Sequence, residues 1–333
     1  MKHVFLIHSH TVFLTAIGVI SRLHLDADNI IFVYFRNYNN SIVPVSYPII
    51  RLDEEYDIAN HLSAFKYCQW KELIKRIDSV INTKIKDEYI LYTSHAGSHF
   101  FQTFITHPNC SQFNYIQEGA LAFDNLLSDR ISFKSLVYDL FNIIIFPLNH
   151  KRIWCSYKWT LNKDVAIAKK TPVCFAISEK IFEKLLYTTI IVEWPKVDPE
   201  YLIDNRFPIF VFESAVEQGL VEKDKYLLCI RQLIETKAAQ KNYLKFHPYQ
   251  STTNRKDIVD LFREYNLGVE ILPDSIPFEL FLTFYSNLKV VGFRSSLLVY
   301  AQQLGHKTFS KEFDLRKMSR KYRAIRKEMN EVQ

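Results

Sequence analysis

Short β-rich runs alternate with segments of helical periodicity along this chain, and that alternation limits the possible folds more than any other feature. The pattern is clearest in the second half. There the predicted strands are residues 208–212, 243–246, 269–272 and 288–293, and the predicted helices are residues 223–239, 254–265, 277–285 and 296–304. Strands that alternate with helices in this way are typical of an α/β protein with parallel sheets.

The first half shows the same alternation less regularly. Its predicted strands are residues 3–7, 30–35, 88–93, 113–117, 173–177 and 189–192, and its predicted helices are residues 11–23, 65–81 and 128–146. Residues 193–205 carry two prolines and four carboxylates, which is the composition of a linker. Because a domain averages about 150 residues, we predict two doubly wound α/β domains that face each other across a cleft. The predicted domains are residues 1–195 and 206–310, followed by a basic helical tail at residues 311–333.

Composition and missing motifs exclude several classes of protein. The chain has only 7 glycines and contains no GxGxxG, GxxxxGKS/T or GxSxG motif, which argues against nicotinamide, P-loop and serine-hydrolase chemistry. A net charge of +6 is too small to indicate nucleic acid binding. The five cysteines form no CxxC pair, as expected for free thiols in a reducing compartment.

The N-terminal segment needs a separate test for a signal peptide or membrane anchor, because Val4 to Ser21 lacks Asp, Glu, Lys and Arg. Its centre reads His8-Ser9-His10-Thr11, which is too polar for a hydrocarbon layer. A strand, a polar turn and a helix fit this segment better. We therefore expect a soluble cytoplasmic protein.

No metal site is expected from the sequence. His8 with His10, and His95 with His99, lack the carboxylate or cysteine neighbours of a metal centre. Asp26-Ala27-Asp28 matches the DxD pattern of metal-dependent nucleotide-sugar transferases, but it falls between a predicted helix and strand and reads as a turn.

The predicted tail is rich in basic residues, and two interpretations stay open. It is either a solvated helix face or a surface attracted to anionic lipid of the inner membrane, where each basic residue contributes roughly 1 kcal/mol. The basic residues are Lys311, Arg316, Lys317, Arg320, Lys321, Arg323, Arg326 and Lys327.

Ligands of open α/β sheets bind beyond the carboxyl ends of the strands, so the residues after each predicted strand are the site candidates. In the first half these are His8-Ser9-His10, Arg36-Asn37, Ser94-His95 and Glu118-Gly119. In the second half they are Glu213-Ser214, His247-Pro248, Pro273-Asp274 and Arg294-Ser295-Ser296.

Each strong candidate has a chemical and a structural interpretation. Glu118 is either a general base for a sugar hydroxyl or a solvated loop residue. His247, held extended by Pro248, either assists a leaving phosphate or is a structural histidine. Ser295 and Ser296 either form a phosphate site at a helix start or simply cap that helix. Glu279 either binds ribose hydroxyls or interacts with the helix dipole.

Taken together, these elements resemble the bacterial sialyltransferases, in particular the lipooligosaccharide and capsule enzymes. Those families have an acidic-acidic-Gly motif, a His-Pro motif and a Ser/Thr motif on a GT-B scaffold of two Rossmann-like domains. The corresponding residues here are Gln117-Glu118-Gly119, His247-Pro248 and Ser295-Ser296, and Ile276-Pro277-Phe278-Glu279 resembles the segment whose glutamate binds the cytidine ribose. The match is strongest over residues 208–309, and Gln117 departs from the acidic pattern.

The resemblance implies inverting transfer of sialic acid from CMP-Neu5Ac to a galactoside hydroxyl of lipopolysaccharide or capsule. Glu118 would be the base, and His247 would stabilise or protonate the leaving phosphate. The 206–310 domain would bind CMP through Pro248, Glu279, Arg294, Ser295 and Ser296. The first domain would hold the sugars near His10, Ser94, His95, Gln117 and Gly119. Neither a metal nor a cofactor is implied.

Two alternatives stay open beside this one. The donor could be CMP-Kdo or another CMP-nonulosonic acid, since cytidine recognition would look the same. The chain could also be a catalytically silent module that binds membranes or glycans. The sequence is compatible with a homodimer and with peripheral contact to the inner membrane through the basic tail.

Overall fold

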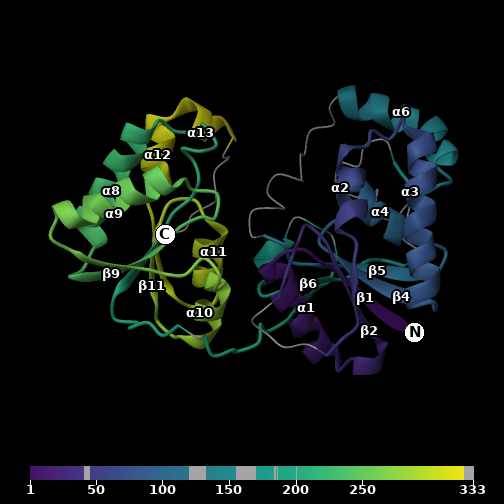
Figure 1. Ribbon diagram of the computed structural model, residues 1–333, viewed down its shortest axis with the longest axis horizontal. Helices are drawn as coiled ribbons and strands as arrows, with labels where there is room; N and C mark the ends of the chain where they lie inside the picture. The colour runs from purple at the N-terminus through teal and green to yellow at the C-terminus, as the bar shows by residue number, and fades with distance from the viewer. Residues whose placement is uncertain are drawn as a thin grey trace. The chain divides into compact units, whose positions relative to one another are not determined.

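The computed structural model describes residues 1–40, 46–119, 133–154, 170–183, 185, 187–199 and 201–325. The chain divides into two compact units, Met1–Pro195 and Lys196–Gln333 (Figure 1). Each unit is built around one parallel sheet with helices packed against it.

Unit 1 is a seven-stranded parallel sheet in the order β3-β2-β1-β4-β5-β6-β7. Its strands are β1 (Lys2–Ile7), β2 (Ile30–Tyr34), β3 (Ile49–Arg51), β4 (Tyr89–Thr93), β5 (Cys110–Ile116), β6 (Cys174–Ala176) and β7 (Thr189–Ile191). Its helices are α1 (His10–Leu23), α2 (Asp53–His61), α3 (Tyr67–Val80), α4 (His99–Ile105) and α6 (Phe133–Leu148). All five residues of β2 are buried, as expected for an inner strand covered on both faces.

Local sequence fixes how α1 leaves β1. Ser9 is the N-cap of α1, and its hydroxyl accepts a hydrogen bond from the Val12 amide. Gly18 lies where α1 meets the chain after β7, and a Cβ there would come within 2.6 Å of the Glu193 carbonyl oxygen. This close approach requires glycine. The helix starts directly beyond the carboxyl end of β1, an inner strand of the sheet.

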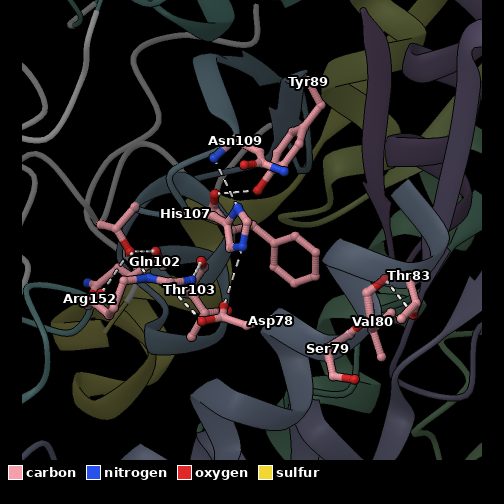
Figure 2. A network of polar contacts seen from close by, with 12 residues as sticks. Asp78, Ser79, Val80, Thr83, Tyr89, Gln102, Thr103, His107, Asn109 and Arg152 are labelled. Carbon is pink, nitrogen blue, oxygen red and sulfur yellow. Dashed lines mark hydrogen bonds and ion pairs between the residues drawn. The ribbon is translucent and has the colours of Figure 1, made fainter. Parts of the chain in front are cut away.

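A buried polar cluster at the amino ends of β4 and β5 ties the helices of unit 1 together (Figure 2). Arg152 donates to Asp78 of α3 at 2.9 Å and to the Thr106 hydroxyl at 2.8 Å. His107 lies 3.8 Å from the same aspartate, and the Tyr89 hydroxyl donates to the Phe104 carbonyl oxygen. These contacts join α3, α4 and the residues after α6, and they lie at the opposite edge of the sheet from the carboxyl ends of the strands, so we assign them a structural role.

Unit 2 is a five-stranded parallel sheet in the order β10-β9-β8-β11-β12. Its strands are β8 (Pro208–Val211), β9 (Lys241–Lys245), β10 (Gly268–Ile271), β11 (Lys289–Gly292) and β12 (Lys307–Ser310). Its helices are α8 (Lys223–Lys237), α9 (Thr252–Glu264), α10 (Phe278–Phe284), α11 (Ser296–Gln303), α12 (Glu312–Met318) and α13 (Arg320–Ile325). The α/β class and the parallel sheets predicted from sequence are confirmed.

The structure differs from the predictions at several elements. The sequence patterns did not predict β3, α2, α4 or β12, which are short. The predicted helix at residues 128–146 corresponds to α6, and its first residues, 128–132, lie outside the described part of the chain. No helix among the described residues is long and apolar enough to span a bilayer.

The basic tail is part of unit 2 as far as residue 325. Leu315 and Tyr322, from α12 and α13, are completely buried in the core of this unit. Within α12, Arg316 lies 3.7 Å from Glu312, and Lys311, which precedes the helix, lies 3.1 Å from Asp314. Arg326 and Lys327 lie outside the described residues. The helices of this segment therefore have an apolar face that packs against the core of unit 2, although basic residues dominate their sequence.

Candidate active site

Four neighbouring strands of unit 1 each present one charged or titratable side chain beyond their carboxyl ends. His8 follows β1, Arg36 follows β2, His95 follows β4 and Glu118 follows β5; we call these four residues the Glu118 cluster. His8 Nε2 lies 2.7 Å from Glu118 Oε1, and an Arg36 guanidinium nitrogen lies 3.8 Å from the same oxygen. His95 Nε2 lies 3.9 Å from Glu118 Oε2. A single carboxylate is therefore surrounded by three basic groups.

These neighbours control the ionisation of Glu118. Burial by itself would raise the pKa of this carboxyl, because its side chain is only 23% exposed. The hydrogen bond from His8 and the electrostatic effects of His8, His95 and Arg36 outweigh burial and lower the pKa to about 2. Glu118 is thus an ionised acceptor at neutral pH, which is the state a general base requires.

His95 faces this carboxylate as a neutral ring, at a distance too long for a hydrogen bond. Burial lowers the pKa of His95 to about 4, so the ring is neutral at neutral pH. Its Nδ1 accepts a hydrogen bond from the Gly97 amide at 3.1 Å, and the single proton of the neutral ring is therefore on Nε2. His95 therefore has no lone pair that could take a proton on the nitrogen that faces Glu118.

The other first-half candidates differ in their contacts. Gln117 is completely buried, and its side-chain oxygen accepts a hydrogen bond from the Ile177 amide. These are structural contacts, and they place a neutral amide where the resemblance suggested an acid. Ser94 is buried, His10 is the first residue of α1 and contacts the Tyr38 hydroxyl at 3.2 Å, and Gly119 follows Glu118. Sugar contacts of these residues stay predictions.

The sequence places His8 and Arg36 among the residues after strands but predicts no role for either. Both directly follow predicted strands, which was the available signal. Arg36 has a left-handed backbone (φ 59°), and so does Asn37 (φ 54°), whose amide donates to Asp53. This turn redirects the chain after β2. The Arg36 guanidinium lies near Glu118 and over the Tyr56 ring.

In unit 2, His247 follows β9 and is exposed. Its Nδ1 accepts a hydrogen bond from the Tyr249 amide at 3.1 Å, so Nε2 carries the proton in the neutral ring as well as in the charged ring. Arg255 of α9 holds this loop, because its guanidinium donates to the His247 carbonyl oxygen at 3.0 Å and to Asp274 at 2.6 Å. His247 is therefore a fixed N–H donor, suited to a phosphate oxygen.

Ser295 and Ser296 begin α11 directly after β11. The Ser295 hydroxyl caps the helix by accepting from the Leu297 amide at 3.2 Å, which confirms the structural interpretation of this serine. Capping leaves the hydroxyl proton available to a second acceptor, and both serines are half-buried. Hydroxyls at a helix start are suited to bind a phosphate, but phosphate binding itself stays a prediction.

Glu279 lies in the first turn of α10, and the loop before this helix is held by a buried lysine. Lys245 Nζ donates to the carbonyl oxygens of Pro273 and Ile276, at 2.6 Å and 2.9 Å. Burial lowers the pKa of Lys245, although the charges of Asp274 and Glu279 act in the opposite direction. Lys245 thus fixes the loop that leads into α10, the helix on which Glu279 lies.

Arg294 is buried, and its guanidinium donates to Glu312 of α12 at 3.2 Å. Nearby, the Tyr322 hydroxyl of α13 donates to Glu213, which follows β8. Burial raises the pKa of Glu312 although Arg294 lowers it. The contacts of Arg294 are those of a structural residue that joins the β11 end to the C-terminal helices, and CMP binding by this side chain stays a prediction.

This buried pair leads to a stability prediction. Arg294→Met leaves Glu312 buried without that partner, and we expect unit 2 to lose about 3 kcal/mol of unfolding free energy in urea titrations. Arg294→Met combined with Glu312→Leu should recover part of the loss. As a control, Arg231→Met removes an exposed pair with Glu264 and should cost less than ~1 kcal/mol. Equal losses for the two single variants would contradict the assignment.

The described residues contain no group of three or more His, Cys, Asp or Glu side chains that could hold a metal ion. Asp26 caps the turn at residues 27–29, where its side chain accepts from the Asp28 amide at 3.2 Å. The interpretation of Asp26-Ala27-Asp28 as a turn is therefore confirmed.

The comparison with protein families decides where this chain belongs. A family model described as alpha-2,8-polysialyltransferase matches residues 46–310, which is most of the chain. The chain belongs to the alpha-2,8-polysialyltransferase family. The sialyltransferase resemblance drawn from the Glu-Gly, His-Pro and Ser-Ser elements is thus confirmed at the level of the family. A search of curated proteins found no match.

Solved structures show which fold this polysialyltransferase-family chain has. A spinosyn rhamnosyltransferase complexed with thymidine diphosphate is similar with a TM-score of 0.54 at 8% identity, over 95% of this chain and 83% of that chain. The UDP-GlcNAc 2-epimerase of Methanocaldococcus jannaschii follows with 0.51 at 12% identity, over 93% and 83%. A sialyltransferase from Photobacterium damsela gives 0.47 at 11% identity, over 90% and 71%. The predicted GT-B fold, with two doubly wound Rossmann-like units, is confirmed.

Proposed function

We propose that this sialyltransferase-family chain transfers sialic acid from CMP-Neu5Ac to a hydroxyl of a bacterial surface glycan, with inversion at the anomeric carbon. The observation that carries the proposal is the Glu118 cluster, an ionised carboxylate held beyond the strand ends of unit 1 by His8, Arg36 and His95. Unit 2 supplies the complementary chemistry, an N–H donor on His247 and hydroxyls at the start of α11.

In the proposed reaction, Glu118 takes the proton of the acceptor hydroxyl as the new C–O bond to the sialyl carbon forms. The bond between that carbon and the CMP phosphate oxygen breaks, and the electron pair leaves with the phosphate. His247 Nε2–H donates to this oxygen, and Ser295 and Ser296 bind the phosphate. In an oxocarbenium-like transition state, the bond to the leaving group is largely broken before the bond to the acceptor oxygen forms. The acceptor hydroxyl becomes strongly acidic once that bond is forming, so a carboxylate of low pKa can take its proton.

The acceptor has two candidates. The motifs suggested a galactoside, and the name of the family suggests sialic acid itself. The guanidinium of Arg36, 3.8 Å from Glu118 and half exposed, favours an acceptor sugar that carries a carboxylate. Lactose and a short α-2,8-linked sialic acid oligomer, assayed side by side for acceptor-dependent CMP release, separate the two.

The proposed reaction needs no metal, because a monophosphate leaves and the phosphate is bound by N–H and O–H donors. We expect acceptor-dependent CMP release to keep at least about half of its rate after dialysis against EDTA. In a metal-dependent enzyme, removal of the metal ion would instead remove several kcal/mol of transition-state stabilisation. Loss of activity in EDTA that Mg²⁺ or Mn²⁺ restores would contradict metal independence.

The same assay separates the alternative donors. CMP release from CMP-Kdo but not from CMP-Neu5Ac would identify the alternative donor, and release from neither would favour the silent binding module.

A further inference from the structure

His8 is the group that contacts Glu118 most closely. It follows β1 directly, its side chain is only 2% exposed, and its Nε2 lies 2.7 Å from Glu118 Oε1. The ring packs against Phe35, with centroids 5.1 Å apart, and near Phe101 at 6.3 Å. These two aromatic side chains restrict rotation of the His8 ring, so the same ring nitrogen stays directed at Glu118.

The direction of this hydrogen bond follows from the charge of Glu118. An ionised carboxylate has no proton and can only accept, so His8 Nε2 carries the proton and donates it to Glu118 Oε1. Within the described part of the chain, His8 Nδ1 is buried and has no hydrogen-bond partner, so Nε2 is the ring nitrogen through which His8 makes its polar contact.

We infer that His8 is a positioning residue, whose Nε2–H fixes the orientation of the Glu118 carboxylate and keeps it ionised for the acceptor hydroxyl. This inference rests on the proposed function. His8 does not itself exchange a proton with substrate: the proton of the acceptor goes to the carboxylate while Nε2–H stays on the ring.

The groups that face Glu118 allow the contribution of His8 to be isolated. His8 comes from the end of β1, Arg36 from the turn after β2 and His95 from the loop after β4. Of these distances, only the one to His8 is short enough for a hydrogen bond. Removing His8 leaves the electrostatic effects of Arg36 and His95 on Glu118 in place.

The test compares His8→Leu, which removes the donor, with His8→Gln, which keeps an N–H of similar reach. His3→Gln is the matched control, because His3 lies on the same strand and contacts Tyr92 instead of Glu118. The pKa of Glu118 is measured in the full chain by carboxyl ¹³C NMR, with the resonance assigned by its absence in Glu118→Gln. Thermal denaturation checks that each variant is folded.

We expect His8→Leu to raise the pKa of Glu118 by at least one unit and to lower kcat about 10- to 100-fold, the usual effect of a hydrogen bond to a charged group. KM for the CMP-sugar should stay within two-fold. His8→Gln should recover most of both effects, and His3→Gln should match the wild type. An unchanged Glu118 pKa in folded His8→Leu would overturn the inference even where the wild type is active. A wild type without transferase activity would overturn the proposed function, while the NMR titration would still test the positioning.

Discussion

His247→Ala is expected to lower kcat for CMP release by at least ~10²-fold, the usual contribution of a positioned general acid. The Tyr249 amide occupies Nδ1 and leaves Nε2–H as the donor, and alanine offers no group that could stabilise the leaving phosphate. The fold of unit 2 should be unaffected because His247 is exposed. Initial rates at saturating donor, with circular dichroism as the fold check, measure the effect.

The control for this variant is His61→Ala, which removes another exposed histidine, at the end of α2 in unit 1. Its kcat should stay within two-fold of the wild type. If His247→Ala also retained near wild-type turnover, the leaving group would be stabilised by other residues, and Ser295 and Ser296 would be the first to test.

Glu118→Gln is expected to lower kcat by roughly 10³-fold, within the range found for general bases. Glutamine has the same shape but cannot take the acceptor proton, so binding of CMP measured by calorimetry should be unchanged. Glu55→Gln is the matched control, because Glu55 is a poorly exposed carboxylate in unit 1 paired with Arg76 at 2.9 Å. Turnover of Glu118→Gln within ten-fold of the wild type would mean that the base is another group.

The pKa of Glu118 also fixes the sign of a pH effect. Since this pKa is lowered from 4.5 to about 2, the stabilisation that Glu118 contributes to unit 1 is fully present above pH 4.5 and is lost as the pH falls toward 2. The Glu118→Gln variant lacks this component and should show a flatter fall in stability over that window. For the same reason, a loss of activity between pH 8 and pH 5 would report a group other than Glu118.

The strands and the polar residues at their carboxyl ends could be predicted from the sequence, because burial periodicity and turn residues are local signals. The Glu118 cluster could not be predicted, because that cluster depends on strand order. His8 and Glu118 are 110 residues apart, and they meet because β1 pairs with β4 and β4 with β5. No local pattern in the sequence encodes which strands become neighbours.

Two further features also depend on contacts between elements that are distant in sequence. Gln117, which departs from the acidic motif, accepts from the Ile177 amide inside the sheet, and the pairing of β5 with β6 creates this contact. In the basic segment after Lys311, the buried side chains of Leu315 and Tyr322 join both helices to the core of unit 2.

A crystal structure of the protein with CMP, or with a non-transferable CMP-sialic acid analogue, tests the central claim most directly. The account predicts the phosphate within hydrogen-bond distance of His247 Nε2 and of the Ser295 and Ser296 hydroxyls, with the ribose at Glu279. A cytidine bound elsewhere in unit 2, or a phosphate without contact to His247, would contradict it.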